Sequence, residues 1–312
     1  MSTLTTTEPK SPAGKPRPVA SLAKTRLTNR WATLAALVIA TLWTVPTIGL
    51  LVSSFRPAQE VRTTGWWTIF AHPGLTTDNY SAVLQAGNSQ LTMAGSFINS
   101  IAITLPATLI PLVLATLAAY AFAWMRFPGK DLVFILVFAL QIVPIQMALV
   151  PLLRLFAVGE IFGFPIIGAF GSAGYAQVWI AHTIFALPLA IFLLHNFIAE
   201  IPNEIIEAAR VDGASHGQIF FRIVLPLTAP AIAAFSIFQF LWVWNDLLVA
   251  LIFADGAVAP ITKLLAEITG SRGQDWHLLT AGAFVAMIVP LAVFFALQRY
   301  FVRGLMAGSA KG

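Results

Sequence analysis

The feature that most constrains the fold is a series of six long apolar runs with very few charged residues. Each run is at least about 20 residues long, the length that an α-helix needs to cross the hydrocarbon layer of a bilayer. Hydrophobic residues make up 58% of the chain and charged residues only 10%, which excludes an ordinary soluble domain. The sequence therefore predicts an all-α membrane protein with six transmembrane helices. The runs lie at about 31–52, 97–124, 132–155, 175–197, 228–253 and 277–301.

The two ends of the chain are polar and basic. Residues 1–30 carry six basic residues against the single acid Glu8 and are rich in Ser, Thr and Pro, which is typical of a disordered tail. The first apolar run is too long for a signal peptide, so we expect it to be retained. This predicts a tail at 1–30, a six-helix transmembrane domain at 31–303 and a second tail at 304–312.

The distribution of Lys and Arg predicts the orientation of the helices. With the N-terminus in the cytoplasm, thirteen of the 18 basic residues fall in residues 1–30, the 125–131 turn, the 198–227 loop and the C-terminal stretch from Arg299. Five fall in the loops on the other side. Because positive residues favour the cytoplasmic side, we expect both termini and the polar stretch 200–226 to be cytoplasmic.

Several apolar runs contain an internal proline, and a few polar residues lie within or beside the runs. A proline such as Pro144 is expected to kink its helix, as membrane helices tolerate. Asp246 is predicted to lie inside the fifth helix near its outer end, where a carboxylate reaching interfacial water is favoured over a proton relay. His182 and His195 are 13 positions apart, which fits no metal-ligand spacing.

The stretch 200–226 is the one long polar segment inside the apolar part of the chain. Glu200, Glu204 and Glu207 recur at a helical spacing, and Ile205, Ala208 and Ala209 form another face of the same predicted helix. Asp212 and Gly213 predict a break after this helix. Ser215 and Gln218 have the spacing of a capping box, so a second helix should begin there and end at Pro226. The pattern alone fits either a helix lying on lipid headgroups or a docking element for a soluble partner.

The same stretch resembles the EAA motif of ABC-importer permeases. Glu207-Ala208-Ala209, three residues, Gly213, nine residues and then Ile223-x-Leu225-Pro226 match that motif at every position. The sequences IPNEIIEAARVDGAS and QRYFVRGLMAGSAKG resemble the carbohydrate-importer branch, in particular the maltose-permease G-type subunit and its alpha-glucoside relatives. The family often has Trp-Asn-Glu where this chain has Trp244-Asn245-Asp246, a change that keeps the charge.

The resemblance implies a type I ABC importer permease fold with a coupling helix at about 203–213. In this family the coupling helix docks in a groove of a cytoplasmic ATPase dimer, and closure of the dimer switches the transmembrane helices between inward- and outward-facing states. Arg210 and Asp212 neighbour the motif positions and would add polar contacts. The C-terminal segment 304–312 would also reach the ATPase.

The resemblance also implies the partners and the cargo. The chain would work with a second permease subunit, the ATPase dimer and an extracytoplasmic sugar-binding protein, surrounded by membrane lipid, to import an oligosaccharide or alpha-glucoside. Six polar or aromatic residues are candidates for a sugar pathway, although packing between helices is the better explanation for each of them. They are Gln141, Asn196, Gln239, Trp242, Asn245 and Asp246.

The sequence gives little support to other functions. There is no Walker A motif, no nucleophile–base pattern and no cysteine, and the basic residues do not gather on a nucleic-acid-binding face. We therefore expect no catalytic residue, cofactor or metal in this chain, and no nucleic acid as a partner. The alternative is an ion-coupled secondary transporter of a small polar solute. It predicts carboxylates near the membrane midplane and inverted repeats, and neither is evident.

Overall fold

The computed structural model describes residues 30–86, 92–161, 163–165, 171, 173–269 and 275–309, with side chains as far as Gln298. The chain divides into two compact units, Met1–Val52 and Ser53–Gly312. The described part of the first unit belongs to one helix, α2 (Arg30–Ser54), which contains Pro46. The tail expected at 1–30 lies almost wholly outside the described residues.

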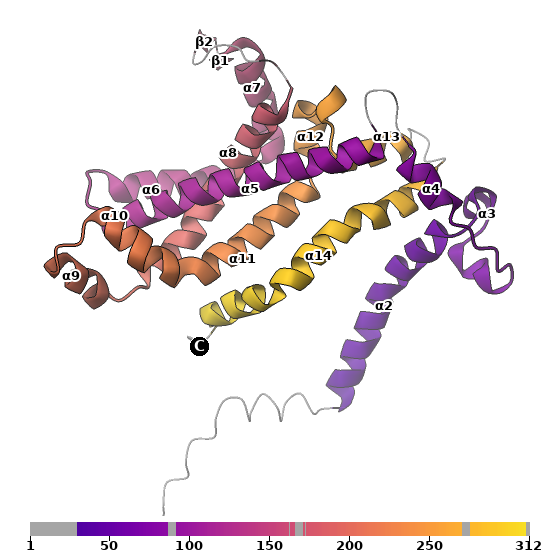
Figure 1. Cartoon of the computed structure of the whole chain (residues 1–312), viewed down its shortest axis with the longest axis horizontal. Helices are drawn as coiled ribbons and strands as arrows, with labels where there is room; N and C mark the ends of the chain where they lie inside the picture. The colour runs from indigo at the N-terminus through magenta and orange to yellow at the C-terminus, as the bar shows by residue number, and fades with distance from the viewer. Residues whose placement is uncertain are drawn as a thin grey trace, which may run out of the picture. The chain divides into compact units, whose positions relative to one another are not determined.

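The second unit is built almost entirely from helices, which Figure 1 shows in chain order. Its one sheet among the described residues is a two-residue antiparallel pair, β1 (Glu160–Ile161) and β2 (Phe164–Pro165). The helices are α3 (Ala58–Thr63), η1 (Trp66–Phe70), α4 (Asp78–Leu84), α5 (Met93–Trp124), α6 (Lys130–Ala139), η2 (Leu140–Ile142), α7 (Ile145–Val158), α8 (Tyr175–Ala199), α9 (Asn203–Val211), α10 (His216–Ile219), the π-helical turn η3 (Phe220–Val224), α11 (Leu225–Trp244), α12 (Leu248–Phe253), η4 (Gly256–Val258), α13 (Ile261–Thr269) and α14 (Trp276–Ser309).

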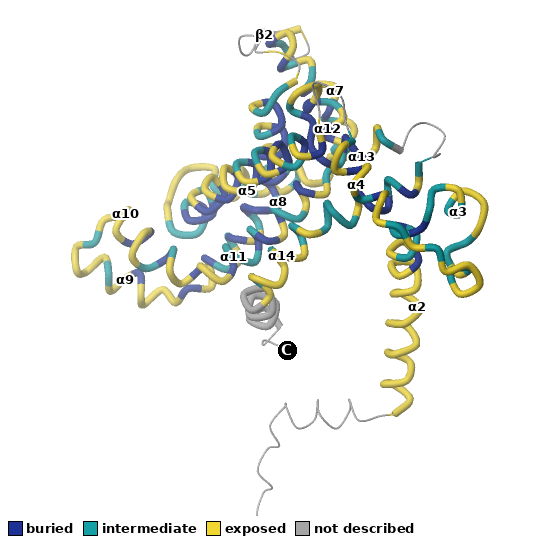
Figure 2. Tube along the Cα trace, turned by 45° about the vertical axis from the view of Figure 1, so that its right-hand side comes forward, coloured by how far each residue is buried: buried dark blue, intermediate teal, exposed yellow. Residues whose placement is uncertain are grey.

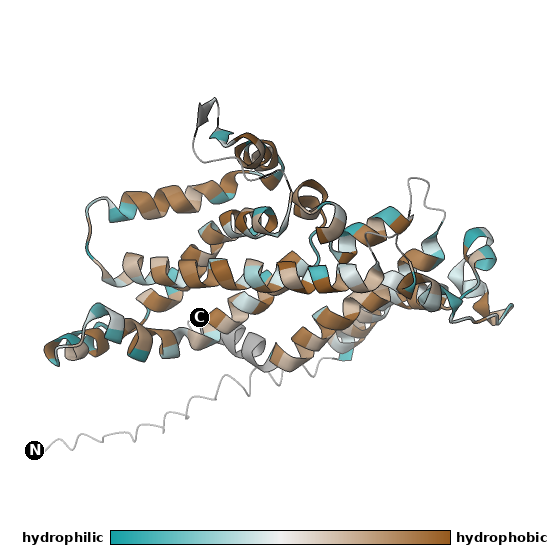
Figure 3. Ribbon diagram, turned by 45° about the horizontal axis from the view of Figure 1, so that its top comes forward, coloured by the Kyte–Doolittle hydropathy of each residue, from teal (hydrophilic) through white to brown (hydrophobic). Residues whose placement is uncertain are grey.

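The prediction of six membrane spans is confirmed, with one of them broken. Five helical segments of the described chain are long and apolar enough to cross a bilayer: α2, α5, α8, α14 and the continuous stretch His216–Trp244. A sixth span forms if α6 with η2 and α7 count as one, and these two parts are bent by 104°. Hydrophobic residues cover the spans, whereas hydrophilic residues gather at α9 and in the loops (Figure 3).

The third run, expected as one kinked helix over 132–155, is interrupted at Val143 and Pro144. Pro144 has no N–H to continue the helix, and its ring disfavours a helical conformation at the residue before it. Val143 accordingly has an extended backbone, with ψ 118°. The proline therefore separates two helices here rather than bending one.

The fifth run was predicted as one helix over 228–253, and both of its boundaries are wrong. The helix begins upstream at α10 and ends at Trp244, and α12 follows as a separate short helix. Pro226 was expected to end a helix, but it lies in the first turn of α11. The helix continues through Pro226 from α10, and the π-helical turn η3 directly before α11 is the kind of local adjustment that accommodates a proline without a backbone N–H inside a membrane helix.

The core of the second unit is the parallel pair α5 and α8, which pack against each other more extensively than any other two elements. A Tyr-x-x-x-Trp pair on α8 fastens their N-terminal ends. The Tyr175 hydroxyl donates to the side-chain carbonyl of Asn99, and the Trp179 indole donates to the carbonyl of Ala102 at 3.0 Å. Figure 2 shows buried residues along both helices, while α9 and α10 are largely exposed. The pair therefore forms a rigid axis for the rest of the unit.

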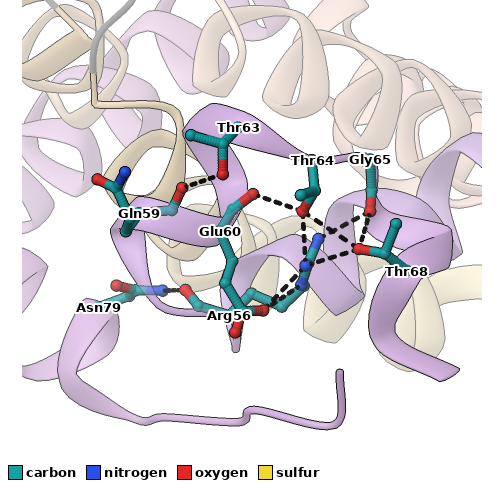
Figure 4. A network of polar contacts seen from close by, with 8 residues as sticks. All are labelled: Arg56, Gln59, Glu60, Thr63, Thr64, Gly65, Thr68 and Asn79. Atoms are coloured by element: carbon teal, nitrogen blue, oxygen red, sulfur yellow. Dashed lines mark hydrogen bonds and ion pairs between the residues drawn. The ribbon is translucent and has the colours of Figure 1, made fainter. Parts of the chain in front are cut away.

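The segment 53–84 is a small folded cap centred on Arg56 (Figure 4). The Arg56 side chain is 1% exposed, and its guanidinium donates to Glu60 at 2.9 Å and to the carbonyl of Gly65 at 2.9 Å. It also donates to the hydroxyls of Thr64 and Thr68, each at 2.9 Å. A buried charge is tolerated only with such a full set of partners.

We predict that Arg56→Leu destabilises this cap by about 2 kcal/mol, because it removes the charged partner of the Glu60 carboxylate and the donor to the Thr64 and Thr68 hydroxyls. The measurement is the thermal unfolding of the purified protein together with proteolysis within residues 53–84. Arg62→Leu is the control, since Arg62 pairs with Asp275 at the surface, 3.0 Å away, with its side chain 48% exposed. Equal stability of the two variants would contradict a structural role for Arg56.

Candidate functional site

The EAA-like segment folds as two short helices joined by a tight turn. Gly213 has φ +80°, in the left-handed region that favours glycine. Its N–H donates to the Arg210 carbonyl at 3.0 Å, and the next N–H, from Ala214, donates to the Ala209 carbonyl at 2.9 Å. These two bonds form a Schellman motif, which satisfies the last carbonyls of α9. The predicted break at Asp212 and Gly213 is confirmed.

The capping box predicted at the start of the second helix is confirmed. The Ser215 hydroxyl accepts from the backbone N–H of Gln218, and the Gln218 side chain accepts from the backbone N–H of Ser215 at 2.8 Å. Two backbone donors at the start of α10 are satisfied in this way. The turn between α9 and α10 is thus fixed on both sides by local hydrogen bonds.

The faces of α9 differ from those predicted. Glu200 lies at the end of α8, so the three carboxylates do not share one helix. The buried residue of α9 is Ile206, which is 1% exposed, whereas Ile205 is 41% exposed. The helix begins only at Asn203, three residues after Glu200, and packs on the core through Ile206, with Ala209 against the same cluster.

The outward surface of α9 combines carboxylates with small and apolar side chains. Glu207 and Ala208 of the motif are exposed, as are the neighbouring Arg210 and Asp212. Val211 is 88% exposed. The carboxylates of Glu207 and Asp212 would be repelled by an anionic leaflet, which argues against a helix lying on lipid headgroups.

Two hydrogen bonds fasten the segment 203–226 to the C-terminal end of α5, and a third joins that end of α5 to α8. The Arg210 guanidinium donates to the Trp124 carbonyl at 3.1 Å, and the Trp124 indole donates to the Ile198 carbonyl at 3.2 Å. The Tyr120 hydroxyl bonds to Nδ1 of His216, 2.9 Å away. Tyr120 and Trp124 thus repeat, on α5, the Tyr-x-x-x-Trp arrangement that Tyr175 and Trp179 make on α8. We call Tyr120 and Trp124 the α5 clamp.

An apolar cluster reinforces these bonds. Ile219, Phe220 and Val224 are buried against side chains of α5 and α8. The motif residues Ile223 and Leu225 pack on the same cluster, while Pro226 is exposed. α10 and η3 are therefore packed into the same core as the C-terminal ends of α5 and α8, and α9 adds Ile206 and Ala209 to it.

The structure brings three of the six candidate sugar-pathway residues together. Gln141, Gln239 and Trp242 line a cavity of about 200 Å³ among η2, α7, α8 and α11. His182 of α8 lines the same cavity and was not among the candidates. Asn196 is exposed elsewhere on α8, and Asn245 is exposed with its side-chain amide donating to the Leu241 carbonyl at 2.8 Å.

Asp246 is not inside a helix, as was predicted, but in the break between α11 and α12. Its Oδ2 accepts from the backbone N–H groups of Val249 and Ala250 at 3.0 and 3.1 Å and so caps the first turn of α12. The same oxygen lies 3.8 Å from Nε2 of His182, which is 3% exposed. Asp246 therefore has a structural role as a cap and lies next to the cavity wall rather than in it.

Comparison with known proteins identifies the family. Residues 112–306 match the model of the binding-protein-dependent transport system inner membrane component. The chain belongs to this family. It is a multi-span permease of the ABC-importer type, as the EAA-like motif predicted. The ion-coupled alternative gains no support.

Curated relatives cover most of the chain. It is 53% identical over 297 residues to the osmoprotective compounds uptake permease protein GgtD of Synechocystis sp., which covers 92% of this chain and 95% of GgtD. It is 50% identical over 250 residues to the alpha-glucoside transport system permease protein AglG of Rhizobium meliloti. That match covers 79% of this chain and 63% of AglG, so the chain spans less than two thirds of AglG.

Solved structures share the fold. A bacterial ABC transporter involved in the import of the acidic polysaccharide alginate aligns with a TM-score of 0.66 at 18% identity, over 89% of this chain and 98% of that one. The same kind of transporter in complex with an alginate pentasaccharide-bound periplasmic protein aligns with a TM-score of 0.64 at 15% identity, over 88% and 94%. The predicted fold of type I ABC importer permeases is confirmed.

We predict that Gly213→Ala loosens the turn after α9, because a side chain in the left-handed region costs about 1–2 kcal/mol. The measurement is hydrogen exchange of the backbone amides of residues 203–215, which should become faster. Gly217→Ala is the matched control, since neither position has any atom within 4 Å of the added Cβ but Gly217 does not have a positive φ. Unchanged exchange in Gly213→Ala would show that the turn does not depend on glycine.

Proposed function

We propose that this chain is a transmembrane subunit of an ATP-driven importer of sugars, in particular of an oligosaccharide or alpha-glucoside. It works with a second permease subunit, a cytoplasmic ATPase dimer and an extracytoplasmic sugar-binding protein. The observation that carries this proposal is the motif segment 203–226, folded into an exposed helix that is fastened to the core spans. The alpha-glucoside permease among the relatives supports the choice of sugar.

The proposed coupling helix is α9, facing the cytoplasm with both chain termini. Glu207, Ala208 and the exposed Val211 form the surface that enters a groove of the ATPase, and Arg210 and Asp212 flank it. The small side chain of Ala208 permits close approach of another backbone. Gly213 holds this surface away from the span that follows. The C-terminal segment 304–312 is proposed to reach the same partner.

The proposed work of this chain is mechanical rather than chemical. ATP shifts the transporter to the outward-facing state only if the ATP-bound dimer interacts more favourably with that state. The α5 clamp supplies the connection, because Trp124 bonds to both Arg210 of α9 and the end of α8. When the coupling helix moves, α5 and α8 therefore move with it. A flexible connecting loop would not transmit this movement.

We predict that Glu207→Lys abolishes sugar uptake and binding of the ATPase subunit, because it reverses a charge at the centre of the docking surface. The measurement is uptake of labelled maltose, trehalose and sucrose by cells that express the whole transporter, together with co-purification of the ATPase. Membrane insertion should be normal. Glu267→Lys is the control, since Glu267 is an exposed carboxylate on α13, outside the coupling segment. Normal uptake and normal ATPase binding in Glu207→Lys would refute the docking role.

We predict that the double variant Tyr120→Phe with Trp124→Phe retains the ATPase but imports about tenfold less sugar per ATP hydrolysed. Two hydrogen bonds of about 1 kcal/mol each are lost, one from Tyr120 to the coupling segment and one from the Trp124 indole to the end of α8. The matched control is Tyr175→Phe with Trp179→Phe, which removes the equivalent bonds at the other end of α5 and α8. The measurement is the ratio of uptake to ATP hydrolysis in proteoliposomes. An equal loss in both double variants would indicate general weakening of the helix pair rather than transmission at the coupling end.

A further inference from the structure

We propose that the cavity among η2, α7, α8 and α11 is a binding site for one ring of a neutral sugar. Gln141, His182, Gln239 and Trp242 make the contacts. The proposal rests on the proposed function and goes beyond it in two respects. It assigns direct contact with the cargo to this subunit, and it names the residues that make the contact.

The helix break beside the cavity is the first argument. Leu140, Gln141, Val143 and Ile145 line the cavity, and they flank the interruption at Val143 and Pro144 in the bent span. Helix ends leave backbone carbonyls without partners inside the helix, and in a membrane these groups are tolerated only where they are buried in protein or line a water-filled cavity. The break therefore places backbone polar groups beside a cavity that has room for water, and a polyhydroxy ligand can offer these groups hydrogen bonds equivalent to those of water.

The side chains of the lining are the second argument. Gln239 is 4% exposed and held by a bond from its amide to the Ala107 carbonyl at 3.3 Å, and His182 is 3% exposed. The lining also contains the exposed amide of Gln141 and, one turn after Gln239 on α11, the ring of Trp242, which is 47% exposed. An aromatic face with a few fixed polar groups is the composition of a site for a ring with polar edges.

The charge of the lining and the volume of the cavity limit which ligands can bind there. None of the lining residues is an aspartate, glutamate, lysine or arginine, so the site offers no counter-ion to a charged cargo. The volume of about 200 Å³ is smaller than a site for a whole drug-sized ligand, which starts at about 300 Å³. The cavity therefore accommodates one neutral ring at a time, and the rest of an oligosaccharide extends beyond it.

A lipid chain is the other possible occupant. Several lining residues are apolar, among them Phe185, Phe238 and Leu189. A lipid chain, however, can make no hydrogen bond with the amides of Gln141 and Gln239 or with the imidazole of His182, whereas a polyhydroxy ligand can. We therefore favour the sugar.

The test uses the absence of cysteine from this chain. Ala148→Cys places one small thiol in the cavity wall, and Ala199→Cys places one at an exposed position of α8 outside the cavity. The assembled transporter is treated with a charged, water-soluble maleimide, and labelling of this chain is followed with and without whichever of maltose, trehalose and sucrose the wild type imports. At about ten times its dissociation constant, that sugar should slow labelling at position 148 about tenfold and leave position 199 unchanged.

Three outcomes would overturn the proposal. One is labelling at position 148 that the sugar does not slow although the variant still imports it. Another is labelling only by an uncharged, membrane-soluble maleimide, which indicates lipid. The third is equal protection by galacturonic acid, which contradicts a site for neutral rings. If the wild type imports none of the sugars, the proposed function fails instead.

A second pair of variants tests the aromatic contact. Trp242→Ala should raise the sugar concentration needed for half-protection at position 148 about three- to tenfold, while Trp242→Phe, which keeps an aromatic face, should restore it. Binding of the ATPase should be the same in both. Unchanged protection in Trp242→Ala would remove Trp242 from the site and refute the proposed contact.

Discussion

The constraint on which the structure depends is that backbone polar groups at membrane depth need partners. Long α-helices meet this requirement within themselves, which is why almost every described residue between the loops is helical. The two places where the spans are interrupted are informative for the same reason. At Asp246 a carboxylate takes over two backbone N–H groups, and at Val143 and Pro144 the chain lies against a cavity.

Buried polar side chains add a second level of organisation. Hydrogen bonds from tyrosine and tryptophan fasten α5 to α8 at both ends, and at one end the same residues hold the coupling segment. Between helices in a bilayer, such bonds and close packing supply the association that the hydrophobic effect cannot. The parallel pair therefore behaves as one body, and the coupling segment is attached to that body rather than to a single helix.

The number of spans and the coupling segment could be predicted from the sequence because both depend on local patterns. Apolar length predicts a span, and the spacings of Gly213, Ser215 and Gln218 predict a turn and a capping box. The third and fifth spans were predicted less well. A proline such as Pro144 is compatible with a kink or a full break, and the choice depends on neighbouring helices. An aspartate directly before an apolar segment, such as Asp246, is a signal for the start of a helix. Because the residues on both sides of Asp246 are apolar, the stretch was interpreted as one continuous span instead.

The pairing of distant residues could not be predicted at all. Tyr120 and Trp124 stand one helical turn apart, which indicates a shared face, but nothing local shows that their partners are His216 and Ile198. Which residues meet at the cavity could not be predicted for the same reason. Gln141, Gln239 and Trp242 were candidates by chemistry alone, and His182 was missed because a lone histidine in an apolar run is more often a packing residue.

The proposed coupling segment and the proposed sugar site lie at opposite ends of one helix. α10, η3 and α11 form a continuous segment from His216 to Trp244, with Val224 buried near one end and Gln239 in the cavity wall near the other. The 15 residues between them span about 22 Å of helix. Because a helix is stiff, a small rotation at the α5 clamp displaces the residues at the cavity directly. No series of weaker contacts between the clamp and the cavity is needed. The wide turn η3 lies where this segment leaves the coupling end, and such turns are frequent at functional sites in helices. The geometry therefore allows one movement of the ATPase to change both the accessibility of the cavity and the position of its polar groups.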